Sequence, residues 1–159
     1  MHPFFKPTLL SLTLMIAPTS AVFSYESKTM MITVKSSSAF DYTTTRERLI
    51  KSVNENGLVL FGEFDHAKEA QNIGLSMPPT TVLIFGNPKG GTPLMLAHPD
   101  LALDLPFRVL ISKQPDDTTL VSYHSAEELQ RYGLTLDSIE ALKKMERLVL
   151  NSIISSEQS

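Results

Sequence analysis

The sequence has 159 residues and a formal net charge of -3, with 42% hydrophobic and 19% charged residues and no cysteine. That length suits one domain, and the composition is typical of globular chains rather than disordered ones. The missing cysteines exclude disulfides, thiolate metal sites and cysteine nucleophiles, and the negative charge argues against a nucleic-acid-binding protein.

Residues 1–21 have the pattern of an export signal. Lys6 supplies the positive start, and an apolar stretch follows at residues 8–17. Small residues precede the bond after Ala21, which is where we expect a signal peptidase to cleave. The alternative is a membrane anchor or a buried helix, but the apolar stretch has only about half the length that a spanning helix needs.

The export signal sets the expected organisation of the chain. We expect a short tether at residues 22–28 and a single domain at residues 29–156. No later segment is apolar and long enough to span a membrane, so no membrane span is expected in the mature chain. The signal predicts a periplasmic or secreted protein.

The domain begins with a predicted strand and helix. Residues 30–35 alternate in polarity and predict a strand, which the serines at 36–38 interrupt. Asp41, or one of the threonines at 43–45, can cap a helix that ends at Asn56-Gly57. The apolar face of this helix would consist of Leu49, Ile50 and Val53.

A second strand, a short helix and a third strand are predicted next. Residues 58–64 predict the strand, and Asp65 could cap a helix from His66 to Ile73. Met77-Pro78-Pro79 is an extended linker. The continuous apolar centre of residues 80–86 is typical of a strand that is buried on both faces or central in its sheet.

The third strand leads into a loop at residues 87–91 and a predicted helix start at Thr92-Pro93, as N-cap and first helical residue. Pro99 would stop this helix. Residues 105–112 and 118–124 predict two more strands, and the turn-forming residues between them predict a hairpin.

Two helices complete the expected domain. Ser125 opens a short one with Glu128 at capping-box spacing, and Thr135 or Asp137 opens the last one. The last helix has an apolar stripe with a spacing of three or four residues: Leu136, Ile139, Leu142, Met145, Val149 and Ile153. Because strands and helices do not alternate regularly, we expect an α+β fold with a mainly antiparallel sheet of about five strands. The first and last long helices would pack on one face of that sheet.

A series of short motifs resembles the DUF302 family, a group of small bacterial and archaeal domains without an assigned function. The resemblance extends over roughly residues 31–134. It implies a TBP-like fold with a curved antiparallel sheet packed by helices, suggests dimers, and implies no established activity. The chain departs from the family at Ile111-Ser112-Lys113, where many relatives have a tryptophan. The motifs are Asp65-His66-Ala67, Ala70, Gly74-Leu75, Pro79-Thr80, Ile84-Phe85-Gly86-Asn87-Pro88, Gly91-Thr92-Pro93-Leu94-Met95 and Leu103-Asp104-Leu105-Pro106.

The loop that follows the third strand is a candidate anion site. It leads into a helix N-terminus, where free backbone N–H groups and the helix dipole favour an anion, and Lys89 adds a positive charge. The alternative is that the two glycines form only a tight turn and that Thr92 only caps the helix. The candidate ligand-binding residues here are Asn87, Lys89, Gly90, Gly91 and Thr92.

Two further groups of polar residues are candidates. His66 and Glu69 share a helix face, which could provide half of a metal site or a general base, or simply a structural hydrogen bond. Asp104 could meet Arg108 on one face of a strand, or bind Thr92 or the loop amides. The alternative is a turn-capping aspartate and a solvated arginine.

These features favour a non-enzymatic small-ligand-binding or assembly module of the cell envelope, acting as a homodimer and taking a small anionic ligand. The first alternative is a small hydrolase or isomerase, with His66 as catalytic acid/base and residues 87–92 holding an anionic group. The second alternative is a metal-binding protein that uses His66 and Glu69. No pattern in the sequence names a cofactor or completes a metal site.

Overall fold

The structure is a computed structural model, and it describes residues 32–155. The predicted signal peptide at 1–21 and the tether at 22–28 lie outside the described residues, as does the first part of the predicted strand at 30–35.

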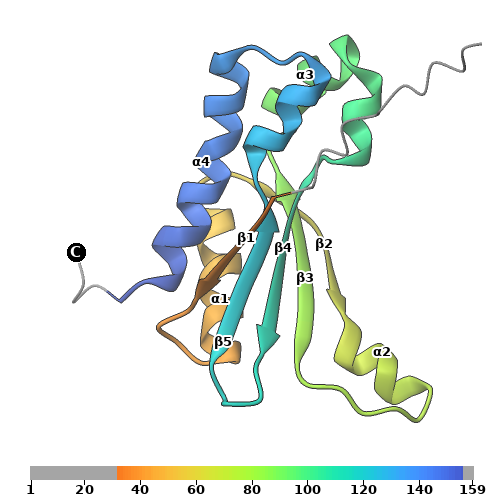
Figure 1. The fold of residues 1–159 in the computed structure, drawn as a ribbon, viewed down its shortest axis with the longest axis vertical. Coiled ribbons are helices and arrows are strands. Elements are labelled where there is room, and N and C mark those ends of the chain that lie inside the picture. Colours follow the sequence, from red (N-terminus) through yellow and green to blue (C-terminus); the bar gives the residue numbers. More distant parts are fainter. Residues whose placement is uncertain (1–31, 156–159) are drawn as a thin grey trace, which may run out of the picture.

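A single antiparallel sheet of five strands forms the centre of the molecule (Figure 1). The strands lie in the order β1-β5-β4-β3-β2, so the two chain-adjacent hairpin strands β4 and β5 are flanked by β3 and β1. This arrangement confirms the predicted α+β class with an antiparallel sheet. The strands are β1 (Thr33–Ser37), β2 (Val59–Asp65), β3 (Thr80–Gly86), β4 (Phe107–Lys113) and β5 (Thr119–His124).

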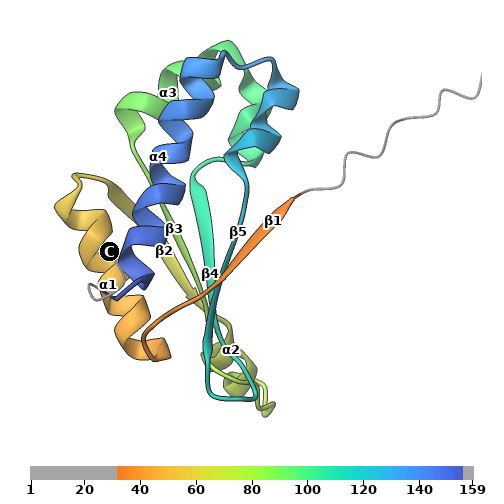
Figure 2. The same cartoon turned by 60° about the vertical axis from the view of Figure 1, so that its left-hand side comes forward.

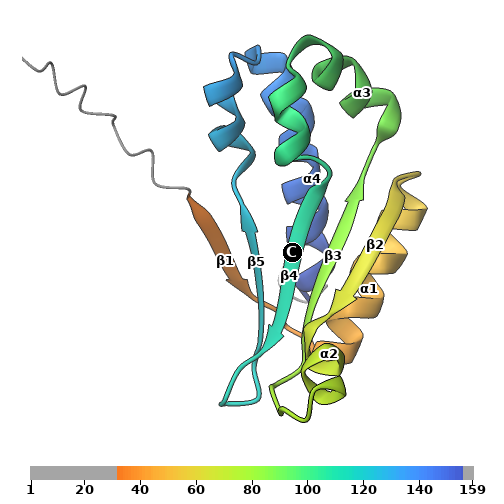
Figure 3. The same ribbon diagram turned by 90° about the vertical axis from the view of Figure 1, so that its right-hand side faces the viewer.

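The two longest helices, α1 and α4, lie side by side on one face of the sheet (Figure 2). The short helix α2 lies at one end of the sheet, and α3 lies at the opposite end (Figure 3). The helices are α1 (Tyr42–Glu55), α2 (His66–Asn72), α3 (Pro88–Ala97) and α4 (Leu136–Ile153), with 3-10 helices η1 (Pro99–Leu103) and η2 (Ala126–Tyr132).

The main core lies between the sheet and the two long helices. Strand residues alternate between the two faces, so every second side chain of β3, β4 and β5 points into this layer. The predicted helix faces meet them there, because apolar residues three or four apart form one stripe. The fully buried members are Leu83, Phe85, Val109, Ile111 and Val121 of the sheet, and Leu49, Val53, Val149 and Ile153 of the helices.

A smaller apolar cluster extends the core beyond the end of the sheet where α3 lies. It joins η1, η2 and the N-terminal part of α4, through buried Leu101, Leu105, Leu129 and Ile139. Leu136 was predicted to share the apolar stripe of α4, but its side chain is 74% exposed. It is the first residue of α4, and it is not among the side chains that pack against this cluster, although Leu134 just before it is.

Local helix signals are confirmed. Asp41 accepts a hydrogen bond from the Thr44 backbone N–H at 2.9 Å and so caps α1. Asp65 caps α2 through the Lys68 N–H in the same way, and Thr135 caps α4. Each of these bonds spans three residues, so the signal lies entirely in the local sequence.

The predicted start of α3 is wrong. The helix begins at Pro88 with Asn87 as its N-cap, so residues 87–91 are its first turn rather than a loop, and Thr92 lies inside it. Both Asn87-Pro88 and Thr92-Pro93 have the N-cap and first-residue pattern, and asparagine is at least as good a cap as threonine. The earlier start also gives the Gly90 and Gly91 N–H groups an acceptor in the Asn87 carbonyl.

Two other local predictions are wrong. Ser36 and Ser37 were expected to break the first strand, but β1 continues to Ser37 because it pairs there with Leu120 of β5. Ser125 does cap η2, but Glu128 does not complete a capping box. Its carboxylate instead accepts a hydrogen bond from the distant Ile32 N–H at 2.8 Å. In both places a tertiary hydrogen bond outweighs a local preference.

Within residues 32–155, no helix combines the length and the apolar character that crossing a membrane requires.

Candidate functional site

A pocket of about 250 Å³ opens between α3, the start of β4 and α4. We call it the α3–α4 pocket. Its walls are mainly apolar, and they unite residues that are far apart in the sequence. The principal apolar side chains are Leu94 and Met95 of α3, Leu105 and Phe107 at the start of β4, and Leu142 and Met145 of α4.

Two glycines of α3 line the pocket. Gly91, Leu94 and Met95 lie on one helix face because they are three and four residues apart. A Cβ atom added at Gly91 would lie 3.9 Å from Met95 Cε and 4.0 Å from Leu105 Cδ1, and so between two wall residues of the pocket. Gly90 also lines the pocket and has open space where a side chain would stand. Glycine is a poor helix former, so these two positions lower the intrinsic stability of α3. They also leave this part of the pocket wall without side chains.

Two side chains bring polar groups to the α3–α4 pocket. Asn87 uses its Oδ1 to accept the Lys89 N–H at 3.0 Å, which leaves its amide NH₂ group as the available donor. Lys144 of α4 contributes an exposed ammonium. Neither a histidine nor a carboxylate lines the pocket among the described residues.

The predicted anion-binding loop is only partly assembled. Asn87, Gly90 and Gly91 line the α3–α4 pocket, whereas Lys89 and Thr92 are exposed and are not among its walls. The backbone N–H groups that were expected to be free are already used. The Lys89 N–H donates to the Asn87 side chain, and both glycine N–H groups donate to the Asn87 carbonyl oxygen.

The cation at the pocket is Lys144 rather than Lys89, and sequence reasoning missed it. Its only local signal is its place beside Leu142 and Met145 on the apolar stripe of the last helix. Nothing in the sequence indicated that this part of α4 would face α3.

His66 lies far from the α3–α4 pocket. It is exposed at the start of α2, next to the N-terminal end of β3, where Asp65 pairs with Thr81. Asn87 follows the opposite end of β3, which is about 17 Å away at roughly 3.4 Å per strand residue. A single small molecule cannot contact both residues, so the structure does not assemble the expected site of His66 and residues 87–92.

The neighbours of His66 are engaged elsewhere. Glu63 forms a bidentate ion pair with Arg46 of α1, and Glu69 accepts a hydrogen bond from Asn72 at 3.3 Å. No three histidine, aspartate or glutamate side chains within residues 32–155 gather as a metal site would require. The pair of His66 and Glu69 therefore gains no third ligand from the part of the chain that is described.

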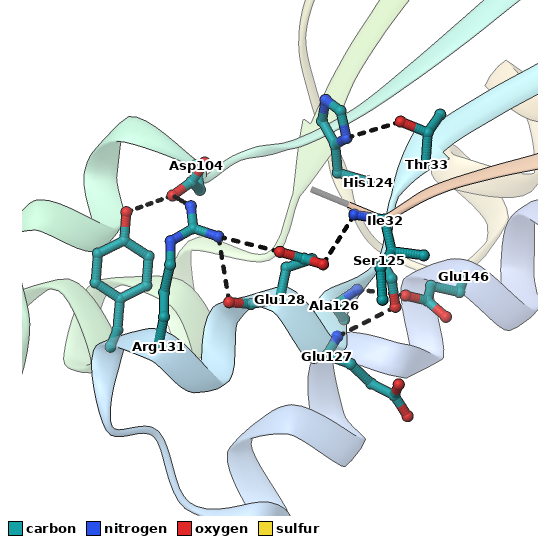
Figure 4. A network of polar contacts seen from close by, with 11 residues as sticks. Ile32, Thr33, Asp104, His124, Ser125, Ala126, Glu127, Glu128, Arg131 and Glu146 are labelled. Atoms are coloured by element: carbon teal, nitrogen blue, oxygen red, sulfur yellow. Dashed lines mark hydrogen bonds and ion pairs between the residues drawn. The ribbon is translucent and has the colours of Figure 1, made fainter. Parts of the chain in front are cut away.

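The candidate contact between Asp104 and Arg108 does not form. The Asp104 carboxylate instead accepts hydrogen bonds from Arg131 at 2.5 Å and from the Tyr132 hydroxyl (Figure 4). The guanidinium of Arg108 donates to the Leu103 carbonyl oxygen at 2.7 Å. Asp104 ends η1 in a helical conformation, which directs its side chain toward η2 rather than along β4.

Arg131 connects Asp104 to a buried carboxylate, Glu128 (Figure 4). One Glu128 oxygen accepts the Ile32 N–H, and the other lies 3.7 Å from an Arg131 nitrogen without a hydrogen bond. We call Asp104, Glu128, Arg131 and Tyr132 the Glu128 network. The hydrogen bond to Asp104 and the partial burial raise the pKa of Tyr132.

The Glu128 network borders two hollows. One of about 40 Å³ lies on the side of Leu105 and Leu142, and a more open one of about 310 Å³ is lined by Ile32, Glu127, Glu128, Gln130 and Arg131. The network connects η1, η2 and the start of β1. Leu105, Phe107 and Leu142, which line the 40 Å³ hollow beside it, also line the α3–α4 pocket. The network therefore supports one side of that pocket.

The family model described as "Domain of unknown function DUF302" matches residues 32–152. This chain belongs to the DUF302 family. The match includes every residue that lines the α3–α4 pocket, from Phe61 to Met145, and confirms the resemblance seen in the sequence. Membership brings no assigned activity with it.

Similar proteins include "Fluoride-specific ion channel FluC 1" of Brucella suis biovar 1 (strain 1330), which is 36% identical over 102 residues. These residues make up 64% of this chain and 40% of that protein. "Fluoride-specific ion channel FluC 1" of Brucella abortus biovar 1 (strain 9-941) has the same identity, with 38% of its length matched. The match thus spans about 40% of the length of these relatives.

A solved structure has the same fold. The crystal structure of an uncharacterized conserved DUF302 protein from Bacillus stearothermophilus superposes with a TM-score of 0.64 at 18% sequence identity. The superposition covers 78% of this chain and 97% of that one. At this identity the likeness shows the fold alone.

Proposed function

We propose that this DUF302 protein is a non-enzymatic small-ligand-binding module of the cell envelope and that its ligand binds in the α3–α4 pocket. The observation that carries the proposal is an apolar pocket of about 250 Å³ with only a few polar groups at its wall. Ligand sites in proteins typically have this make-up, and their volumes start at about 300 Å³. The ligand is therefore a small one.

Binding is a better account of this pocket than acid–base catalysis. A general acid or base must lie within hydrogen-bond reach of the reacting group. The candidate for that role, His66, lies at the other end of β3, and the described pocket wall contains no histidine or carboxylate. A hydrolase or isomerase mechanism through His66 has no observation in its favour.

The similarity to proteins named fluoride-specific ion channels does not lead us to propose fluoride transport. The matched residues are 40% and 38% of the lengths of those proteins, so the channel activity in their names need not belong to the shared part.

The envelope location rests on the N-terminal sequence. Residues 1–21 combine a positive start at Lys6, a short apolar stretch and small residues up to Ala21, which is the pattern that a signal peptidase recognises. Expression of the full chain, followed by N-terminal sequencing of the protein in the periplasmic and culture fractions, tests this. A new N-terminus at Val22 is expected, and a chain that keeps Met1 in the cytoplasm would overturn export.

We also propose that the module forms homodimers through β2. This edge strand carries three exposed apolar side chains: Val59 at 43%, Phe61 at 51% and Phe64 at 56%. An exposed apolar edge invites pairing with another strand, and a second copy can supply an identical one. Light scattering after size exclusion should give twice the chain mass, and Phe64→Lys should give the monomer mass. A wild-type monomer at high concentration would contradict the dimer.

Native mass spectrometry of the mature protein, recovered without harsh washing, tests the ligand-binding proposal. We expect a mass excess that Gly91→Leu removes, because a side chain at Gly91 would fill the space between Met95 and Leu105. His66→Ala is the matched control and should keep the excess. An excess that survives Gly91→Leu but disappears in His66→Ala would move the site to α2 and overturn the proposal.

A further inference from the structure

The polar side chains of the α3–α4 pocket are all hydrogen-bond donors. The Asn87 Oδ1 accepts the Lys89 N–H, and the Asn87 NH₂ group remains as a donor without a partner among the described residues. The Lys144 ammonium has three donors and no acceptor. A ligand that satisfies both must present acceptors, and no lining carboxylate among the described residues would repel a negative charge.

Lys144 is available to a ligand in a way that its neighbour is not. The Lys143 ammonium lies 2.6 Å from Glu127 and 3.4 Å from Glu140, and the hydrogen bond to Glu127 raises its pKa. Within residues 32–155, Lys144 has no ion pair or hydrogen bond. An unpaired cation at the edge of an apolar pocket favours a ligand with one negative charge.

The rest of the pocket favours a hydrocarbon chain. Leucine, methionine and phenylalanine side chains form its walls, and methionine adapts to flexible apolar groups. A volume of about 250 Å³ is many times what a single water molecule requires. The pocket therefore has room for a short chain of several carbon atoms.

We propose that the α3–α4 pocket binds an amphipathic monocarboxylate, with its apolar chain between α3 and α4 and its carboxylate at Lys144 and Asn87. This inference rests on the proposed ligand-binding function and adds the chemical class of the ligand. Both carboxylate oxygens accept hydrogen bonds, so one head group can satisfy the Lys144 ammonium and the Asn87 amide together.

Calorimetric titration with three probes of one chain length tests the class: octanoate, octanol and octylammonium. The wild-type protein should bind octanoate at least threefold more tightly than octanol, and octylammonium most weakly. Among hexanoate, heptanoate and octanoate, affinity should rise about fourfold per methylene until the pocket is full.

Three variants connect this preference to the named residues. Lys144→Gln should abolish the preference for octanoate over octanol, whereas Lys143→Gln should keep it. Asn87→Asp keeps a good helix cap but replaces the donor with a carboxylate, so it should reverse the order of octanoate and octylammonium. Gly91→Leu should weaken all three probes by tenfold or more.

The outcomes separate the ligand class from the pocket itself. Equal binding of the three probes, or an octanoate preference that survives Lys144→Gln, would overturn the monocarboxylate. The pocket would stand in that case if Gly91→Leu still weakened every probe. If no probe binds the wild-type protein, the proposed ligand class is wrong. The proposed ligand-binding function is then tested separately, by the mass excess in native mass spectrometry and its loss in Gly91→Leu.

Discussion

An Arg131 nitrogen lies 2.5 Å from an Asp104 carboxylate oxygen, and this ion pair joins the end of η1 to η2 across 27 residues of sequence. The same Asp104 oxygen accepts the Tyr132 hydroxyl. The two 3-10 helices are thereby held against each other beside the apolar cluster that contains Leu101 and Leu129. The stability of this part of the domain should therefore depend on Asp104.

A double-mutant cycle can measure that ion pair. We expect a coupling energy of about 0.5–1 kcal/mol between Asp104→Ala and Arg131→Ala, because the pair is partly exposed and solvent screens it. The matched cycle of Asp104→Ala with Arg108→Ala should give a value near zero, since Arg108 donates to the Leu103 carbonyl instead. Urea unfolding supplies the free energies. The opposite ranking of the two cycles would contradict the observed pairing.

Tyr132 should make the stability of the domain sensitive to alkaline pH. Its hydrogen bond to Asp104 and its burial raise the pKa of the hydroxyl in the folded state. A group with a raised folded pKa stabilises below its unfolded pKa, about 10 for tyrosine, and loses that contribution as pH rises through the folded value. The stability advantage of the wild type over Tyr132→Phe should thus be constant to about pH 9 and shrink above it. Urea unfolding at a series of pH values checks this, and an advantage that is independent of pH would speak against the bond.

Two glycine substitutions should have opposite effects. Gly91→Ala should stabilise the protein by about 0.5–1 kcal/mol, because alanine favours a helix and its Cβ would make ordinary contacts. Gly133→Ala should destabilise it by about 1 kcal/mol, because Gly133 closes η2 at a φ of 74° that side chains disfavour. Thermal and urea unfolding of both variants give the signs, and a destabilised Gly91→Ala would show that the α3 wall is tighter than described.

Glu128 should hold the start of the edge strand β1 in place. Its carboxylate is the acceptor for the Ile32 N–H, and its side chain is only 4% exposed. Glu128→Ala should destabilise the domain by about 1–3 kcal/mol, because it leaves a backbone donor without its partner. Hydrogen exchange should accelerate at the start of β1 more than in β3.

The matched control for Glu128 is its neighbour Glu127, whose side chain is 55% exposed and pairs with Lys143. Glu127→Ala should change stability by no more than about 0.5 kcal/mol. If both variants are equally stable and β1 exchanges as in the wild type, the Glu128 contact to Ile32 does not hold the strand.

The sequence by itself determined the elements and their class. Asp41, Asp65 and Thr135 were recognisable as helix caps because each bond joins residues three apart. The apolar periods of the strands and of α4 predicted which face would be buried, since burial follows from spacing. The motif series from Asp65 to Pro106 was sufficient to identify the DUF302 family.

Only the tertiary structure decided the site. Asn87-Pro88 and Thr92-Pro93 are equivalent as local signals, and the choice between them determined whether the glycines lie in a loop or in the wall of a pocket. Asp104 pairs with Arg131 rather than Arg108, and Lys144 rather than Lys89 joins Asn87 at the pocket. These pairs of residues are 27 or more positions apart, and the packing of whole helices, which no local spacing encodes, brings them together.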